Sequence, residues 1–153
     1  MKTLIFGYGI TGKAVETFFK VKSKEYLIYD DNENVILDIK KELLFDESQI
    51  DLIDEIVISP GINPSHKQIK NFETKNIITD IDLFSREFQG KFIGVTGTNG
   101  KTTFVNLLTD FLISKGINAV ACGNVGVSPL SINFEDKDLA IVELSSFQLY
   151  YAS

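Results

Sequence analysis

Short apolar runs alternate with helical patterns along the whole chain. Six runs have strand character and are separated by polar or turn residues: residues 3–6, 26–29, 56–58, 92–95, 119–121 and 139–142. Such alternation is typical of βαβ units, in which helices connect parallel strands. The pattern therefore predicts an α/β protein with parallel sheets, and ligands are expected at the carboxyl ends of the strands.

Two apolar stripes predict amphipathic helices, and each follows a glycine-rich turn. The first stripe contains Ala14, Val15, Phe18 and Phe19. The second has the spacing i, i+3, i+4, i+7 and i+8 and contains Phe104, Leu107, Leu108, Phe111 and Leu112. We expect both helices to cover the sheets.

The most suitable domain boundary lies near Gln89 and Gly90, just before a new strand. It divides the chain into a Rossmann-like unit, residues 1–88, and the start of a P-loop-type ATP-binding domain, residues 89–153. The second unit has only three predicted strands when the chain stops inside a predicted helix start. Because a domain seldom ends there, we expect this chain to be part of a longer protein.

Composition excludes several classes of function. A net charge of −6 without a basic cluster argues against nucleic acid as the main partner. No run of about 20 apolar residues is present, so membrane insertion is not expected. The N-terminus has no signal-peptide pattern, which favours the cytoplasm.

The single cysteine and the single histidine offer little chemistry. Cys122 cannot form a disulfide within the chain and is expected to be a small buried residue. His66 lies in a polar stretch and is expected in a loop or at a helix start. A histidine-based metal site is therefore not predicted.

A glycine-rich turn between an apolar strand and a helix predicts a phosphate-binding loop for ATP. Its expected binding residues are Gly97, Thr98, Asn99, Gly100, Lys101, Thr102 and Thr103. Lys101 can reach the terminal phosphates, and the Thr102 hydroxyl can bind Mg²⁺. Val95 stands where the general pattern has its first glycine, and Gly97 supplies flexibility two residues later.

A second glycine signature, Gly7, Gly9 and Gly12, follows the first strand with the G-x-G-x-x-G spacing. Asp30 and Asp31 end the next strand, where an acid suits a ribose hydroxyl. Taken alone, this pattern predicts a dinucleotide site with NAD as the first candidate. Other nucleotide diphosphates use the same turn, so the ligand stays open on these residues alone.

Together the motifs resemble those of the Mur ligase family, and within it the branch that adds D-glutamate. The motifs are GYGITG at 7–12, SPGI at 59–62, DIDLF at 80–84, GVTGTNGKTT at 94–103, GNVG at 123–126 and ELSSFQL at 143–149. The loop TGTNGKT also occurs in folylpolyglutamate synthases. Phe147 and Asn99 stand where other Mur ligases usually carry histidine, which favours the D-glutamate branch.

The resemblance implies roles for individual residues. It implies that the uridine-diphosphate substrate is held by Ile10, Thr11, Asp30, Asp31, Gly61, Asn124, Ser145 and Gln148. It also implies that Glu143 binds Mg²⁺ with Thr102, and that Lys101 and Glu143 are the catalytic residues. Helix capping is the alternative role for Ser145.

The implied reaction is an ATP-dependent amide ligation of peptidoglycan precursor synthesis. The γ-phosphate of ATP activates the carboxylate of UDP-N-acetylmuramoyl-L-alanine as an acyl phosphate, which D-glutamate then attacks. The resemblance also implies ATP and Mg²⁺ as cofactors and a monomeric enzyme. The family uses a carbamylated lysine, a further histidine and a third domain that these 153 residues lack, so we expect this chain alone to be inactive.

Two other readings of the motifs remain. One is another amide ligase of the same superfamily, such as a folylpolyglutamate synthase or a different Mur ligase. The other is a non-catalytic module that binds NAD or another nucleotide.

Overall fold

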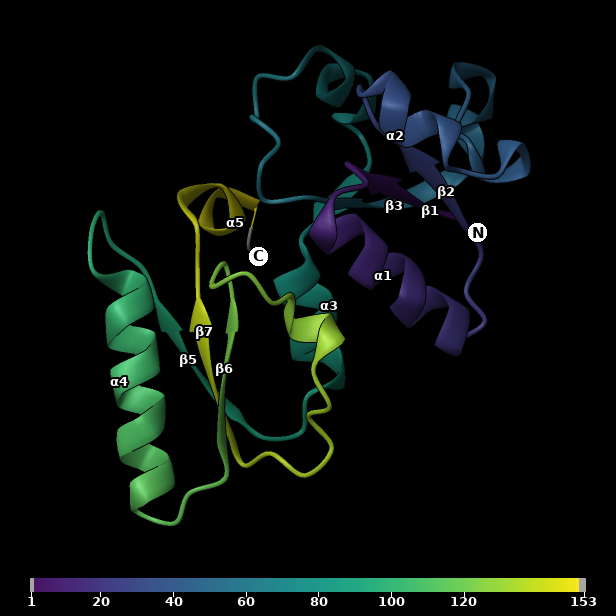
Figure 1. Cartoon of the computed structure of the whole chain (residues 1–153). Coiled ribbons are helices and arrows are strands. Elements are labelled where there is room, and N and C mark those ends of the chain that lie inside the picture. Colours follow the sequence, from purple (N-terminus) through teal and green to yellow (C-terminus); the bar gives the residue numbers. More distant parts are fainter. Residues whose placement is uncertain (1, 152–153) are drawn as a thin grey trace.

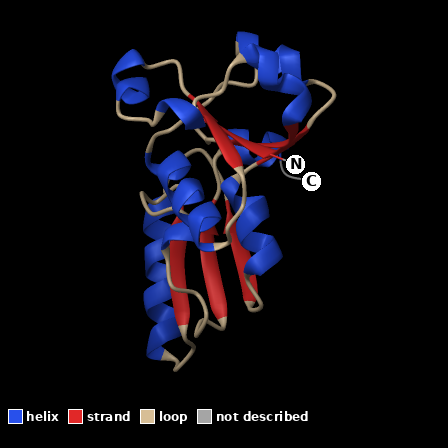
Figure 2. Ribbon diagram, turned by 90° about the vertical axis from the view of Figure 1, so that its right-hand side faces the viewer, coloured by secondary structure: helices blue, strands red, loops and turns tan. Residues whose placement is uncertain are grey.

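The computed structural model describes residues 2–151 and shows two α/β units, each built on a parallel sheet (Figures 1 and 2). The first sheet has the order β2-β1-β3-β4 and the second β5-β7-β6. The strands are β1 (Lys2–Phe6), β2 (Tyr26–Tyr29), β3 (Ile53–Ile58), β4 (Asn76–Ile78), β5 (Lys91–Val95), β6 (Ala119–Gly123) and β7 (Leu139–Glu143). The predicted fold class is confirmed. Strand β4 was not predicted, because a three-residue strand carries too little pattern.

Each helix follows a strand in chain order. They are α1 (Ile10–Val21), α2 (Glu33–Leu37), α3 (Asp80–Glu87), α4 (Lys101–Ser114) and α5 (Ser146–Tyr151). Short 3₁₀ turns occur at Lys41–Leu43, Glu47–Leu52, Lys67–Phe72 and Pro129–Ser131.

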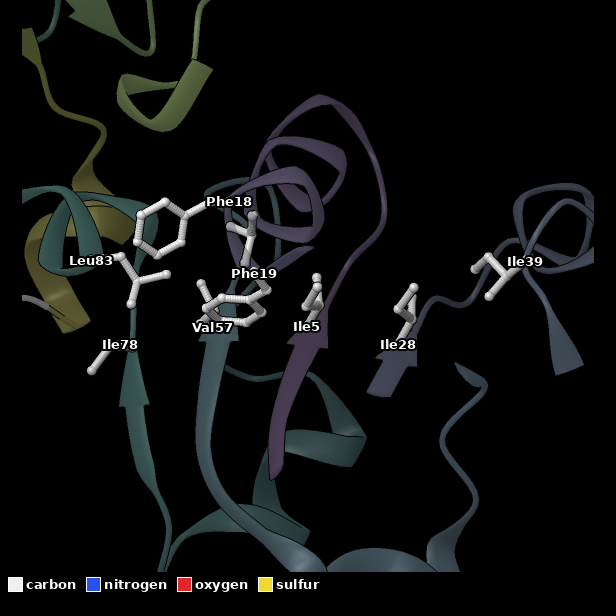
Figure 3. Packing of buried hydrophobic residues seen from close by; sticks show 9 residues of the cluster. Ile5, Phe18, Phe19, Ile28, Ile39, Val57, Ile78 and Leu83 are labelled. Atoms are coloured by element: carbon white, nitrogen blue, oxygen red, sulfur yellow. The ribbon is translucent and has the colours of Figure 1, made fainter. Parts of the chain in front are cut away.

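Both faces of the first sheet are buried. In β1, Ile5 joins the cluster that includes Phe18 and Phe19 of α1 (Figure 3), whereas its neighbours Leu4 and Phe6 join the cluster on the opposite face. This explains why the strands are continuous apolar runs rather than alternating ones. The predicted stripe of α1 is the face that packs on this sheet.

Helix α3 contributes to the cores of both units. Leu83 packs in the first-unit cluster that contains Val57, while Ile81 and Phe84 pack with Cys122 and other residues of the second sheet. Cys122 is fully buried, as expected. In Figure 1, α3 lies between the two units and connects them. The two units are therefore joined by a shared helix rather than by a free linker.

The stripe predicted for α4 is mostly not its packing face. The helix forms at the predicted place, but the buried positions are Val105 and Thr109, whereas Phe104, Leu107 and Phe111 are each more than half exposed. The expectation that this stripe covers the sheet was wrong for these three residues. Helix α4 contacts β6 and β7, and the other two stripe residues, Leu108 and Leu112, are partly buried.

Within residues 2–151, none of the helices combines the length and apolar character that crossing a bilayer would require.

Candidate functional site

The first glycine-rich turn is held in place by side chains of neighbouring strands. Gly7 has a φ of +92°, a conformation that favours glycine. The Ser59 hydroxyl donates to the Gly7 carbonyl at 2.8 Å, and the Tyr8 amide donates to the Asp30 carboxylate at 2.6 Å. A Cβ on Gly12 would lie 2.2 Å from the Gly7 carbonyl oxygen, so the turn and α1 meet too closely for any other residue.

One side of this turn stays open. A Cβ added to Gly9 or to Gly61 would meet no atom within 4 Å. Gly9 is also the residue immediately before α1, so the first amides of the helix face the same space. An anion could therefore approach the backbone closely at this point.

Two side chains contact the Asp31 carboxylate at the end of β2. The Tyr29 hydroxyl donates to it at 2.7 Å, and Nε2 of His66 lies 2.6 Å from its other oxygen. The Tyr29 hydrogen bond, followed by the contact with His66, holds the pKa of the Asp31 carboxyl below its usual value. Burial and the Asp31 contact raise the pKa of Tyr29 to about 12. His66 begins a 3₁₀ turn, as expected.

The second glycine-rich turn is exposed and makes few contacts. Gly97 has a φ of +148°, and Gly100, the residue that precedes α4, has a φ of +75°. A Cβ added to either glycine would have no neighbouring atom within 4 Å. The Lys101 ammonium donates to the Gly97 carbonyl at 2.7 Å and so folds back over its own loop. The predicted loop between a strand and a helix is therefore present.

Thr102 and Glu143 meet at the carboxyl end of the second sheet. The Thr102 hydroxyl donates to a Glu143 oxygen at 2.7 Å, and the Asn124 amide lies 3.4 Å from the other oxygen. Glu143 is only 3% exposed, although it ends a strand. One hydroxyl and one carboxylate beside this glycine-rich turn fit Mg²⁺, which takes few protein ligands and completes its shell with water and phosphate.

A pocket of about 130 Å³ lies where the two units meet. The first unit contributes Ile10 and Thr11, and the second contributes Asn124 and Gln148. Four of the predicted uridine-substrate residues are thus brought together across the two units. Asp30, Asp31 and Gly61 lie instead at the carboxyl ends of strands of the first sheet, outside this pocket.

Ser145 and Gln148 form a reciprocal cap at the start of α5. The backbone N–H of Gln148 donates to the Ser145 hydroxyl oxygen at 3.1 Å, and the backbone N–H of Ser145 donates to the side-chain Oε1 of Gln148 at 2.9 Å. This is the helix-capping geometry that was the alternative for Ser145. The Ser145 hydroxyl keeps a hydrogen that it can donate to a ligand.

Asp80 and Ser128 also line the pocket, and neither was predicted as a site residue. Asp80 is 1% exposed and accepts hydrogen bonds from Ser128 and Gln148. Burial raises the pKa of the Asp80 carboxyl, and these hydrogen bonds oppose that effect. The motif containing Asp80 was visible in the sequence, but its partners lie 48 and 68 residues away.

Curated proteins are similar to the chain over nearly its whole length. Three examples all carry the name UDP-N-acetylmuramoylalanine--D-glutamate ligase. The protein of Protochlamydia amoebophila (strain UWE25) is 37% identical over 97% of the chain, that of Rickettsia prowazekii (strain Madrid E) 38% over 95%, and that of Coxiella burnetii (strain Dugway 5J108-111) 33% over 96%. No protein-family model matches the chain.

The matched regions are only part of these relatives. They amount to 37%, 34% and 36% of the three proteins, so the chain spans about a third of the length of the curated relatives it matches.

Proposed function

Because this chain belongs to the Mur ligase family, we propose that it forms the uridine-substrate site and the ATP-binding loop of a ligase that adds D-glutamate to UDP-N-acetylmuramoyl-L-alanine. Residues 1–88 and 89–153 are the proposed units, with α3 packed against both. The proposed reaction also requires ATP, Mg²⁺ and D-glutamate.

One observation carries the proposal. Two glycine-rich turns occupy the carboxyl ends of two parallel sheets in the same chain, and residues of both units line a common pocket. Each turn exposes backbone amides and a helix start, which favour phosphate groups. A substrate that carries a diphosphate and a second substrate that carries a triphosphate match this pair of turns.

The second turn has the groups that phosphoryl transfer needs. A carboxylate does not acylate an amine in neutral water without activation, so the γ-phosphate of ATP is transferred to it first. Lys101 would neutralise charge on the transferred phosphoryl group, and Thr102 with Glu143 would hold Mg²⁺. The ion would supply further charge neutralisation at the phosphate oxygens. Residues 97–103 would cradle the phosphates through their amides.

The first unit would bind the uridine end of the substrate. Ile10 and Thr11 begin α1 beside the open space at Gly9, where a diphosphate can approach. Asp30 and Asp31 would face the ribose and uracil, and Gly61 would allow backbone contact. Asn124, Ser145 and Gln148 would reach the sugar-diphosphate region from the second unit.

Calorimetric titration of the chain tests this proposal. The chain is titrated separately with UDP-N-acetylmuramoyl-L-alanine and with NAD. Saturable binding of the UDP-sugar, without comparable binding of NAD, is the expected result. Preferential binding of NAD would replace the ligase proposal with a dinucleotide-binding module.

A further inference from the structure

Asp80 connects three segments that are distant in sequence. It is the first residue of α3, the helix shared by both units, and its side chain is 1% exposed. One carboxylate oxygen accepts from Nε2 of Gln148 and the other from the hydroxyl of Ser128, each at 3.0 Å. A buried carboxylate with donors on both oxygens fixes the positions of those donors.

The Gln148 amide has only one orientation that satisfies its neighbours. Its oxygen faces the Ser145 amide at 2.9 Å, and its nitrogen faces Asp80. Rotating the amide by half a turn would place its oxygen against the Asp80 carboxylate and its NH₂ group against the Ser145 N–H. Because the nitrogen carries two hydrogens and Asp80 accepts one, the second can serve the pocket that Gln148 lines.

Ser128 ends the segment that carries Asn124. That segment begins at Gly123, where an added Cβ would lie 2.3 Å from the Glu143 carbonyl oxygen. The backbone N–H of Gly123 donates to the Val127 carbonyl at 2.9 Å, so the two ends of the segment are hydrogen-bonded to each other. Ser128 is 4% exposed and donates to Asp80. Asp80 therefore anchors the segment at the end opposite Gly123.

We propose that Asp80 is a positioning residue of the pocket between the two units, which orients the Gln148 amide and the 123–128 segment without touching the ligand itself. This inference rests on the proposed function for the identity of the ligand. In this role Asp80 acts as a hydrogen-bond acceptor for Gln148 and Ser128. Its negative charge is not required to position them.

The distinction between acceptor and charge suggests two substitutions. In Asp80→Asn, Oδ1 can still accept from Gln148, and the new NH₂ group can donate to the Ser128 oxygen. In Asp80→Leu, both contacts are lost, while the side chain keeps the same branching and number of heavy atoms. Affinity for UDP-N-acetylmuramoyl-L-alanine should fall on the order of tenfold in Asp80→Leu and stay within about threefold of the original in Asp80→Asn.

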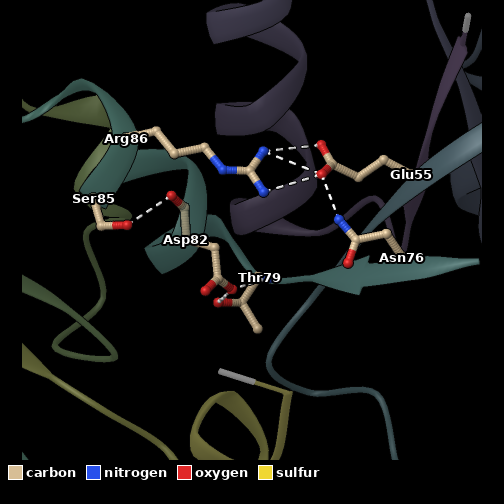
Figure 4. A network of polar contacts seen from close by, with 6 residues as sticks. All are labelled: Glu55, Asn76, Thr79, Asp82, Ser85 and Arg86. Atoms are coloured by element: carbon tan, nitrogen blue, oxygen red, sulfur yellow. Dashed lines mark hydrogen bonds and ion pairs between the residues drawn. The ribbon is translucent and has the colours of Figure 1, made fainter. Parts of the chain in front are cut away.

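Asp82 provides a matched control on the same helix. Its carboxylate accepts from the backbone amide and the hydroxyl of Thr79 and so caps the start of α3, with no hydrogen bond to Gln148 or Ser128 (Figure 4). Asp82→Leu should lower the unfolding temperature and leave the affinity unchanged. If Asp80→Leu does not fold, Ser128→Ala removes one of the two contacts and should still reduce affinity severalfold.

Side-chain amide NMR gives a readout that does not depend on the ligand. The Gln148 NH₂ signals should be protected from solvent exchange in the original chain and in Asp80→Asn, and lose this protection in Asp80→Leu. Unchanged protection in Asp80→Leu, unchanged affinity there, or equal loss of affinity in Asp80→Asn would each overturn the positioning role. Protected Gln148 signals in a chain that binds no UDP-sugar would instead refute the proposed function alone.

Discussion

The two glycine-rich turns hold corresponding places in their sheets but differ in how they are supported. The first is braced by Ser59 and Asp30 from neighbouring strands, and Gly12 packs directly against the Gly7 carbonyl. The second is exposed: Lys101 folds back onto Gly97 within the turn, and Thr102, where α4 begins, donates to Glu143 of the sheet. The first turn is thus packed against the core on one side, whereas the glycines of the second turn contact no neighbouring segment.

Because of this difference, we expect substitutions in the two turns to have different effects on folding stability and on ligand binding. Substitutions in the first turn should affect folding, because its atoms contact buried neighbours. Substitutions in the second should affect ligand binding with little cost to folding, because few contacts are lost. Loops that bind ligands are commonly drawn from the less stable parts of a fold.

The largest expected effect concerns the glycines of the first turn. Gly12→Ala should lower the free energy of unfolding by about 3 kcal/mol, because the new methyl group meets backbone. Gly9→Ala should cost less than about 1 kcal/mol, because it meets open space. Gly9→Ala should nevertheless weaken binding of the UDP-sugar. Urea unfolding with calorimetry measures both, and equal stability of the two variants would contradict the account.

The next effect compares a side chain that supports the first turn with one that belongs to the second turn. Asp30→Ala should reduce the free energy of unfolding by about 2 kcal/mol, because it leaves the Tyr8 amide without its acceptor. Thr98→Ala, in the exposed second turn, should change it by less than about 0.5 kcal/mol. Thermal unfolding of the two variants under one buffer condition measures the difference. A larger loss in Thr98→Ala would show that the second turn is also part of the stable core.

Lys101 tests the second turn through binding. Lys101→Ala should weaken MgATP binding by about tenfold or more, because a charged donor to phosphate is lost. The unfolding temperature should barely change, since the lysine contacts only its own loop. Lys115→Ala, at the far end of α4, has the same charge change and is the control. Equal effects of the two variants on ATP binding would rule out a local role for Lys101.

The smallest expected effect is the pH dependence contributed by Asp31. Its pKa lies below the usual 3.8 in the folded chain, so its contribution to stability is present above that pH and is lost as pH falls through the lowered value. Because the side chain is more than half exposed, the contribution should stay below about 1 kcal/mol. Acid unfolding of Asp31→Asn should be slightly less steep than that of the original. A steeper profile would contradict the assigned direction.

Patterns within short segments predicted most of the fold. Buried strands such as β1 and β7 are continuous apolar runs, and α1 follows its glycine turn with a clear stripe. The α4 stripe misled because periodicity shows that a helix has an apolar face but not what covers that face. Leu107, on that stripe, is 64% exposed.

The pocket was only partly predictable. The glycine turns and Lys101 have local signatures, and motif resemblance placed Asn124 and Gln148 near the substrate. Asp80 belongs to the DIDLF motif, but its role could not be predicted, because that role depends on contacts with Ser128 and Gln148 that only the tertiary structure creates. The capping contact of Ser145 was one of two alternatives, and the sequence could not choose between them.

Simultaneous binding of two phosphate ligands tests the central claim most directly. Amide NMR spectra of the chain are recorded with UDP-N-acetylmuramoyl-L-alanine, then with MgATP added at saturation. The account predicts shifts around Gly9 and Thr11 with the first ligand, and further shifts confined to residues 97–103 and their neighbours with the second. Displacement of the UDP-sugar by MgATP, or one set of shifted residues for both ligands, would contradict it.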